Sequence, residues 1–148
     1  MIGGSGFLGS HVADELSRRG FAVTIFDKEP SPWLTSDQRF VQGDLLDQAS
    51  LADCCEKARY VYHFAGVADI GVAKVQPYQT IESNVLGAAS VLEAVRDSGA
   101  ERFVYASTMY VYSAAGSFYR ASKQAAETII EAYCDSLGLD FTLSLIHI

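Results

Sequence analysis

The sequence has few cysteines, no long apolar run and no excess of basic residues. Its three cysteines, Cys54, Cys55 and Cys134, have neither a C-x-x-C spacing nor histidine partners at metal-ligand intervals, so we expect no metal site. Acidic residues outnumber basic ones by 18 to 11, giving a formal net charge of −7. This balance argues against a nucleic-acid partner, because phosphate binding needs clustered Lys and Arg. No apolar run approaches the roughly 20 residues that cross a bilayer, so we expect no membrane partner.

The N-terminus also lacks a charged region followed by an apolar one, which is the pattern of a secretory signal peptide. An odd number of cysteines without such a signal fits a reducing compartment. These two features predict a cytoplasmic protein.

Short β-branched and aromatic runs alternate with helical patterns along the 148 residues, enough for one domain with a real core. The runs read as near-continuous apolar segments, which is typical of strands covered on both faces. Strands that alternate with helices of this length imply right-handed crossovers and a parallel sheet. We therefore predict an α/β fold, a doubly wound parallel sheet of the Rossmann-like kind. The expected strands are 21–26, 39–42, 60–64, 102–106 and 140–145, and the expected helices are 7–19, 48–57, 77–97 and 118–137, with a loop at 28–38.

A glycine-rich turn opens the chain, with the pattern G-x-x-G-x-x-G at Gly3, Gly6 and Gly9. The first glycine permits a tight turn, and the second lets the backbone approach a pyrophosphate. The third allows close contact between helix and strand, and the helix that begins here offers unpaired N–H groups. Alone the pattern is weak, since glycine-rich turns before helices are common.

An acidic residue, Asp27, follows the first expected strand, eighteen residues beyond Gly9. A carboxylate at this place accepts hydrogen bonds from both hydroxyls of an adenosine ribose and repels a 2′-phosphate, which favours NAD over NADP. Lys28 follows at once and weakens that preference. The alternative is a solvated carboxylate at a strand end.

Together with Ser10-His11 after the glycine turn, these features resemble the extended short-chain dehydrogenase/reductase family, of the NAD-dependent epimerase/dehydratase type. Three further elements match in order: G-D-hydrophobic at 43–45, H-x-A-G at 63–66 and N-V-x-G from Asn84. By the resemblance, Asp44 faces the adenine amino group, Leu45 lies by the ring, and 64–66 lie beside the ribose and pyrophosphate. The alternatives are a satisfied strand-end histidine at 63, a turn residue at 44 and a helix residue without a ligand at 84. The implied NAD-binding residues are Gly3, Ser5, Gly6, Phe7, Leu8, Asp27, Asp44, Leu45, Phe64, Ala65, Gly66, Asn84, Tyr119 and Lys123.

The pattern Y-x-x-x-K at Tyr119 and Lys123 carries the expected chemistry. The i, i+4 spacing places both side chains on one helical face. A nearby ammonium favours the phenolate, so we expect a lowered Tyr119 pKa and a general acid/base for a hydroxyl–ketone interconversion. The segment from Ser107 resembles the family's S-S/T-x-x-V-Y segment, which implies that Thr108, with Ser107 as the fallback, hydrogen-bonds the substrate oxygen. The predicted catalytic residues are thus Thr108, Tyr119 and Lys123.

Two departures from the family pattern stand out. The dehydratase branch has an acidic pair where this chain has Met109 and Tyr110, which disfavours elimination of water. Only ten residues separate Thr108 from Tyr119, so Gly116 and Ser117 must form a tight connection.

The resemblance implies an NAD-dependent epimerase/dehydratase-type oxidoreductase that acts on a hydroxyl or ketone carbon, with a nucleotide sugar as the small-molecule substrate. The alternatives are a reductase or dehydrogenase of a non-sugar carbonyl, such as a sterol or flavonoid, and a non-catalytic dinucleotide-binding module. The family often dimerises through the two helices that correspond to 77–97 and 118–137, so a homodimer through these helices is expected.

The chain reads as truncated at both ends. Only Met1 and Ile2 precede the glycine turn, too few for the family's first strand, and the substrate-binding half is missing, so the fragment itself is expected to be inactive. The incomplete NAD-binding domain is assigned to 1–142. The segment 143–148 resembles a translated sequencing adapter and is taken as a non-native tail that can still pair as a strand.

Overall fold

Parallel strands form the centre of the computed structural model, which describes residues 1–146. Strand β1 (Val23–Asp27) pairs with β2 (Gln38–Gln42), and β4 (Arg102–Thr108) pairs on one side with β3 (Tyr60–His63) and on the other with β5 (Asp140–Ile146). Isolated parallel bridges from Ile2 to Phe26 and to His63 join the two groups. The order across the sheet is therefore β2-β1-Ile2-β3-β4-β5, which confirms the predicted doubly wound parallel arrangement.

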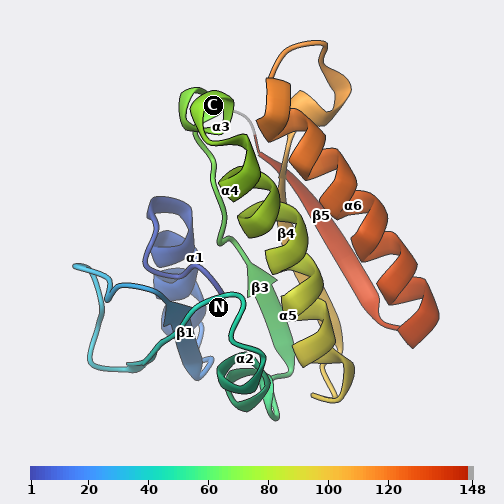
Figure 1. Cartoon of the computed structure of the whole chain (residues 1–148). Helices are drawn as coiled ribbons and strands as arrows, with labels where there is room; N and C mark the ends of the chain where they lie inside the picture. Colours follow the sequence, from blue (N-terminus) through green and yellow to red (C-terminus); the bar gives the residue numbers. More distant parts are fainter. Residues whose placement is uncertain (147–148) are drawn as a thin grey trace.

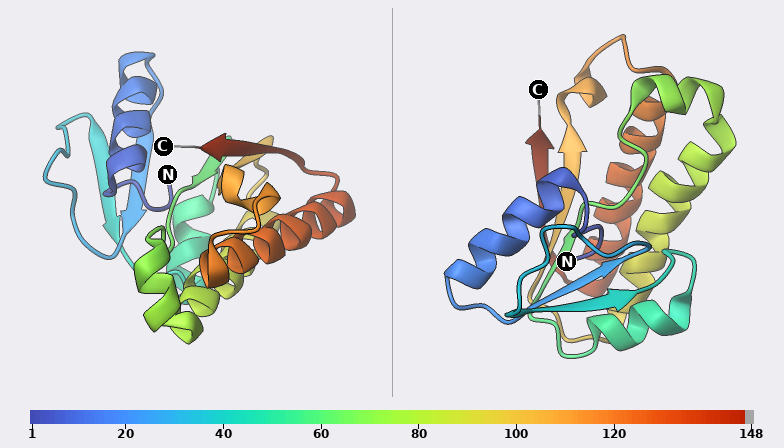
Figure 2. Two further views of the ribbon diagram at one scale, coloured as in Figure 1. Left: turned by 90° about the horizontal axis from the view of Figure 1, so that it is seen from above. Right: turned by 90° about the vertical axis from the view of Figure 1, so that its left-hand side faces the viewer.

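Helices cover both faces of this sheet. Helix α1 (Phe7–Arg18) lies on one face, and α2 (Gln48–Cys55), α5 (Gly87–Arg96) and α6 (Ser117–Leu137) lie on the other (Figures 1 and 2). The predicted helix at 77–97 is present as three consecutive helical segments: α4 (Pro77–Ile81), a π-helical turn η1 (Glu82–Leu86) and α5. Short elements α3 (Ile70–Val75) and the 3₁₀ turn η2 (Met109–Tyr112) were not predicted.

The hydrophobic core lies between the sheet and the helices α5 and α6. Phe103 and Tyr105 of β4 meet Val91 and Leu92 of α5 and Ile130 of α6, and each of these side chains is almost fully buried. The alternation of sheet and helix in the sequence therefore produces a core that holds the carboxyl ends of the strands at one edge.

The predicted bounds of the five strands agree with the structure to within about two residues. Glycines follow three of the helices, as is typical of helix C-termini: Gly20 after α1, Gly99 after α5 and Gly138 after α6 have positive φ angles of 84°, 75° and 63°. Of the expected non-native tail, 143–146 belong to β5 and pair with β4, while 147–148 lie outside the described residues. The structure does not test the adapter interpretation, which stays a prediction. Within residues 1–146, every helix is too short or too polar to cross a membrane.

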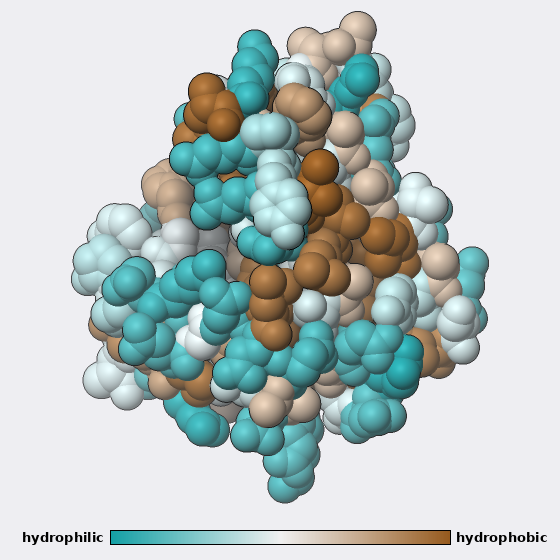
Figure 3. All heavy atoms as spheres, viewed as in Figure 1, coloured by the Kyte–Doolittle hydropathy of each residue, from teal (hydrophilic) through white to brown (hydrophobic). Residues whose placement is uncertain are grey.

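Large apolar side chains are exposed at the end of α3 and along α4 and η1. Val75, Tyr78, Ile81 and Leu86 are 76%, 79%, 48% and 53% exposed, and α6 adds Phe118 at 43%. In the space-filling view, apolar surface gathers over this part of the molecule (Figure 3).

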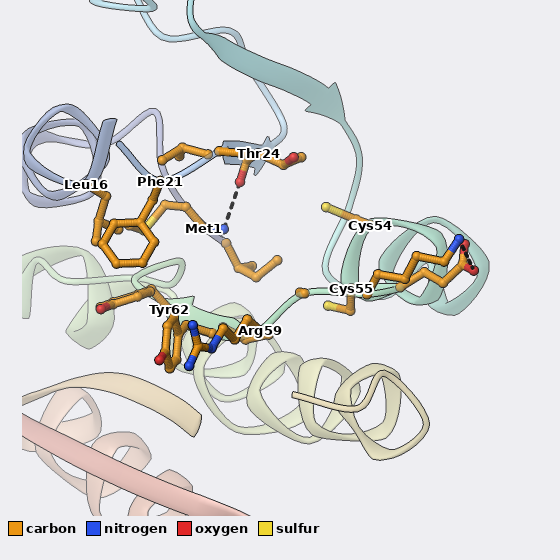
Figure 4. Close-up of a pocket in the computed structure, with 16 residues that line it drawn as sticks. Met1, Leu16, Phe21, Thr24, Cys54, Cys55, Arg59 and Tyr62 are labelled. Atoms are coloured by element: carbon orange, nitrogen blue, oxygen red, sulfur yellow. Dashed lines mark hydrogen bonds and ion pairs between the residues drawn. The ribbon is translucent and has the colours of Figure 1, made fainter. Parts of the chain in front are cut away.

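The sheet has an incomplete position between β1 and β3. Ile2 donates to the backbone oxygen of Tyr62 at 2.8 Å, and Gly3 donates to that of Phe26 at 2.9 Å. Below these bonds a cavity of about 360 Å³ opens, lined on its two sides by β1 and β3 and closed by the side chains of α1 and α2 (Figure 4). The charged amino group of Met1 points into it and donates to the oxygen of Thr24 at 2.8 Å. Met1–Gly3 thus pair with both neighbouring strands at their carboxyl ends, and the cavity lies below them.

Candidate active site

The glycine turn connects the bridge at Ile2 to helix α1. Gly3 has a φ of 81°, and a Cβ placed on it would lie 2.2 Å from the amide nitrogen of Ala65. A Cβ on Gly9 would lie 2.2 Å from the backbone oxygen of Gly3. Only glycine fits either place, which confirms the predicted tight turn and close helix contact. At Gly6 the nearest atom to such a Cβ is 3.7 Å away, so the turn is open on that side.

Helix α1 begins at this open side. Its N-cap is Gly6, no side chain caps it, and its first turn carries no acidic residue. Its first backbone N–H groups are therefore available to an anion, and the helix dipole favours negative charge there. Phe7 and Leu8, predicted to contact NAD, are 70% and 39% exposed beside the turn.

The carboxylate of Asp27 sits at the end of β1, against the glycine turn. It accepts a hydrogen bond from the amide of Ser5 at 2.9 Å and one from the amide of Lys28 at 2.8 Å. The hydroxyl oxygen of Ser5 is buried and has no hydrogen-bond partner among the described residues. The predicted pair of a glycine turn and an acidic strand end is therefore one local structure, with a polar atom left over for a ligand.

The G-D-hydrophobic element divides between surface and core. Asp44 is half exposed, caps the amide of Leu46 at 2.9 Å and forms an ion pair with Lys28 at 3.0 Å. The hydrogen bond from Leu46 and then the Lys28 ammonium lower the pKa of Asp44 below its usual range. Leu45 is only 9% exposed and packs in the core beside Gly87. Asp44 is thus available to a ligand, whereas Leu45 offers little free surface.

The turn after β3 is fixed by Asn84 of η1. Its Oδ1 accepts from the amide of Val67 at 2.7 Å, and its Nδ2 donates to the oxygen of Val67 at 3.0 Å and to Ser122 Oγ at 2.9 Å. Asn84 is 1% exposed, so its amide group is occupied by the protein itself. A Cβ on Gly66 would lie 2.4 Å from its Oδ1. Asn84 therefore holds this turn and α6 together.

Phe64 and Ala65 begin the same turn, where their amides donate to the oxygen of Ile2 at 2.8 and 3.2 Å. The predicted H-x-A-G residues thus lie directly beside the glycine turn. His63 itself is fully buried, and neither ring nitrogen has a hydrogen-bond partner among the described residues. Burial, with smaller effects from Lys123 and the chain's amino group, lowers its pKa to about 3. It is therefore a neutral core residue in this structure.

The three predicted catalytic side chains meet at the end of β4. Thr108 is the last residue of the strand, and Tyr119 and Lys123 lie one turn apart near the start of α6. They are 4%, 8% and 5% exposed. The Lys123 ammonium donates to the backbone oxygen of Ala106 at 2.9 Å and lies 4.5 Å from the centre of the Tyr105 ring. The tight connection expected before α6 is present: Gly116 and Ser117 have φ angles of 103° and 48°.

The expected lowering of the Tyr119 pKa is wrong for the free chain. Burial raises the pKa of Tyr119, and a hydrogen bond with Thr108 opposes this only in part. The physical reason is that the phenol is desolvated while the Lys123 ammonium bonds to Ala106 instead of facing the phenol oxygen. Burial also lowers the pKa of Lys123 to about 8, against the opposing effect of the Glu127 carboxylate.

A pocket of about 830 Å³ joins the glycine turn to these three side chains. Nine of the predicted site residues line it: Gly3, Gly6, Phe7, Leu8, Phe64, Gly66, Thr108, Tyr119 and Lys123. The other six, Ser5, Asp27, Asp44, Leu45, Ala65 and Asn84, lie outside its lining. A pocket of this size is sufficient for a small-molecule ligand.

Sequence reasoning missed one wall of this pocket. Ala68, Asp69, Ile70 and Gly71 line it at the start of α3, whose N-cap is Asp69 through a 2.8 Å bond from the amide of Val72. An Asx residue three positions before an apolar one was the available signal. Met109 and Tyr110, which stand where the resemblance implies an acidic pair in a dehydratase, also line the pocket. Over residues 1–146 no group of three or more His, Cys, Asp or Glu side chains is placed to hold a metal ion.

Known proteins are similar to this chain in sequence and in fold. A UDP-glucose 4-epimerase of Erwinia amylovora is 33% identical over 77% of this chain and 37% of its own length, and a human sterol-4-alpha-carboxylate 3-dehydrogenase (decarboxylating) is 31% identical over 75% and 29%. The crystal structure of a UDP-glucose 4-epimerase from Brucella ovis in complex with NAD superposes with a TM-score of 0.88 at 29% identity, covering 96% of this chain and 49% of that one. The chain thus spans less than half the length of each. Residues 1–146 match the NAD dependent epimerase/dehydratase family, and the chain belongs to that family.

Proposed function

We propose that this chain is the NAD-binding part of an oxidoreductase that interconverts a hydroxyl and a ketone on a nucleotide sugar, as an epimerase does. One observation carries the proposal: the pocket that begins at Gly3 and Gly6 ends at Thr108, Tyr119 and Lys123. A dinucleotide laid from the open glycine turn along the carboxyl edge of the sheet brings its far end to these side chains.

The residues present fit NAD by several independent features. Gly6 leaves room for the pyrophosphate above the uncapped start of α1, and the Asp27 carboxylate is placed for the adenosine ribose. The buried, unpartnered hydroxyl of Ser5 is a further polar contact at the turn. When bound, NAD would accept and return a hydride at the substrate carbon.

The chain's own residues handle the proton. Because burial raises the pKa of Tyr119, its phenol is protonated in the free chain and can donate to a substrate oxygen. Thr108 holds the same oxygen in place through its hydroxyl. Ser107, the fallback for this role, donates instead to the Glu127 carboxylate, which favours Thr108. Lys123 would stabilise the phenolate that forms during the reaction.

The test has two parts. Calorimetric titration of this chain with NAD and NADP should show binding of NAD and weaker binding of NADP, and Asp27→Asn should reduce the difference. In the full-length protein, Tyr119→Phe should abolish turnover with UDP-glucose and leave NAD affinity unchanged. A Tyr119→Phe protein that keeps its turnover would refute the assigned role of the phenol.

A dehydrogenase or reductase of a non-sugar carbonyl is the second candidate, favoured by the sterol dehydrogenase among the relatives. Release of free NADH in step with substrate conversion would support it, because an epimerase regenerates its bound cofactor.

We also propose a homodimer through the exposed apolar residues of α4 and η1, with Phe118 of α6. The exposure of Tyr78, Ile81 and Leu86 supports it, since such a cluster is uncommon on a monomer surface. Sedimentation of Tyr78→Glu beside the unchanged chain tests it. The cytoplasmic location stays a prediction.

A further inference from the structure

Glu127 belongs to a row of side chains on α6 that the proposed mechanism uses only in part. Tyr119, Lys123 and Glu127 follow one another at intervals of four residues, which places them on one face of the helix. That face packs against β4, and the row ends at Glu127 one turn beyond the buried ammonium. Glu127 itself is half-buried, so its carboxylate gains from a hydrogen-bond partner within the protein.

Two adjacent residues of β4 each bind one member of this row. Ala106 accepts from the Lys123 ammonium at 2.9 Å, and Ser107 donates through its hydroxyl to the Glu127 carboxylate. Ser107 is 3% exposed. The next residue of the strand is Thr108, which bonds Tyr119. The two contacts therefore fix the register of α6 along β4 at the point where Tyr119 must meet Thr108.

The charges around the Lys123 ammonium make Glu127 more than a structural contact. The ammonium lies over the ring of Tyr105 from β4, and its charge acts on the imidazole of His63 from β3; Tyr119 and Glu127 lie one turn before and one turn after it on its own helix. Among these groups only Glu127 carries a negative charge when Tyr119 is a phenol. No carboxylate within residues 1–146 is within 4 Å of the ammonium. Glu127 is thus the counter-charge that acts on it through the protein interior.

We propose that Glu127 is a positioning residue of this active site: it anchors Ser107 at the end of β4 and keeps Lys123 charged beside Tyr119. The inference rests on the proposed function and deepens it, because a neutral amine would not stabilise the phenolate. Loss of the carboxylate's charge should leave the pocket's shape intact and remove the proton from Lys123 at a lower pH.

The experiment is an NMR titration of the ligand-free chain with lysine labelled with ¹³C at Cε. The four lysines give few signals, and Lys123→Arg identifies that of Lys123. Glu127→Gln keeps the acceptor for Ser107 and removes the charge, so the Lys123 pKa should fall by about one unit. Ser107→Ala removes the hydrogen bond and keeps the charge, so it should lower the melting temperature while the Lys123 pKa changes far less. Glu131→Gln, at an exposed carboxylate one turn further along α6, is the matched control and should change neither.

An unchanged Lys123 pKa in folded Glu127→Gln protein would overturn the proposal and leave Glu127 a structural residue. If Glu127→Gln does not fold, the double variant with Ser107→Ala removes the contact between the two side chains as well and gives the same readout. The titration contains no NAD, so its outcome is separate from that of the NAD-binding experiment. In the full-length enzyme the alkaline limb of the pH–rate profile should move to lower pH in Glu127→Gln, which a loss of stability alone would not cause.

Discussion

Lys123 donates to the backbone oxygen of Ala106 at 2.9 Å, so the strand, and not the phenol of Tyr119, holds the ammonium in the free chain. The side chain is 5% exposed and lies over the ring of Tyr105. Its position is therefore set before any ligand arrives, by β4 on one side and by its own helix on the other. The protonation of this one group links the stability of the chain to the chemistry proposed for it.

Replacing Lys123 by Met should change how stability depends on pH. Burial lowers the pKa of Lys123 from 10.5 to about 8, so the folded state holds its proton less firmly than the unfolded chain does. This destabilisation is fully present below pH 8 and disappears as the pH rises toward 10.5. Relative to Lys123→Met, the unchanged chain should gain about 2 kcal/mol in free energy of unfolding between pH 7 and pH 10.

Urea unfolding of both proteins at the two pH values measures this gain. Lys74→Met, at an exposed lysine, is the control and should run parallel to the unchanged chain. Parallel behaviour of Lys123→Met would mean that the ammonium is not desolvated in solution.

His63 should make the chain sensitive to mild acid. Its fully buried imidazole has a pKa lowered to about 3 from 6.5, so the fold is stabilised by keeping it neutral above pH 6.5. This contribution is lost as the pH falls from 6.5 toward 3, by about 2 kcal/mol at pH 5. His63→Leu, which keeps an apolar side chain between Phe103 and Tyr105, should remove that part of the slope of melting temperature against pH. His11→Gln, at an exposed histidine, is the control and should keep the slope of the unchanged chain. If His63→Leu keeps that slope too, the prediction is contradicted.

The parts of the site that depend on local spacing could be predicted from the sequence. The turn at Gly3, the acid at Asp27 and the pair Tyr119–Lys123 each follow from intervals along the chain, and each lies where the spacing placed it. The order of strands follows as well, because alternation of buried strands and helices allows few connections. The short helix α3 was missed because six residues are too few to show an apolar periodicity that distinguishes a helix from a loop.

The protonation states could not be predicted from the sequence. The Tyr119 pKa depends first on how far the folded chain shields the phenol from water, and then on the hydrogen bond with Thr108 and the neighbouring Tyr110, none of which the Y-x-x-x-K spacing shows. The partner of Ser107 is hidden for the same reason: Glu127 lies 20 residues further along and meets it only because α6 returns across β4. Likewise, Asn84 looks like a ligand-binding residue until its hydrogen bonds to Val67 and Ser122 are known.

The two glycines Gly6 and Gly9 should respond differently to alanine. A Cβ on Gly9 would lie 2.2 Å from the oxygen of Gly3, so Gly9→Ala should destabilise the chain by about 1–3 kcal/mol or more. At Gly6 the nearest atom is 3.7 Å away, so Gly6→Ala should destabilise the chain by only about 0.5–1 kcal/mol, because alanine is a poorer N-cap than glycine. The added methyl group would instead occupy the space proposed for the pyrophosphate. NAD affinity should fall by about tenfold or more, equal to about 1.4 kcal/mol.

Melting curves and NAD titrations of both variants separate these effects. A Gly6→Ala protein that melts normally and binds NAD as tightly as the unchanged chain would show that the dinucleotide lies elsewhere.

Filling the slot between β1 and β3 should stabilise the chain. Burial lowers the pKa of the Met1 amino group, and Thr24 of β1 and Tyr62 of β3 line the cavity from its two sides (Figure 4). Four apolar, β-branched residues added before Met1 would pair with both strands and move the charge to the surface, raising the melting temperature by about 5 °C. A matched extension of the same length with proline at its second and fourth positions cannot make the same bonds and should raise it far less. Equal melting temperatures for the two extensions would show that the slot closes in solution.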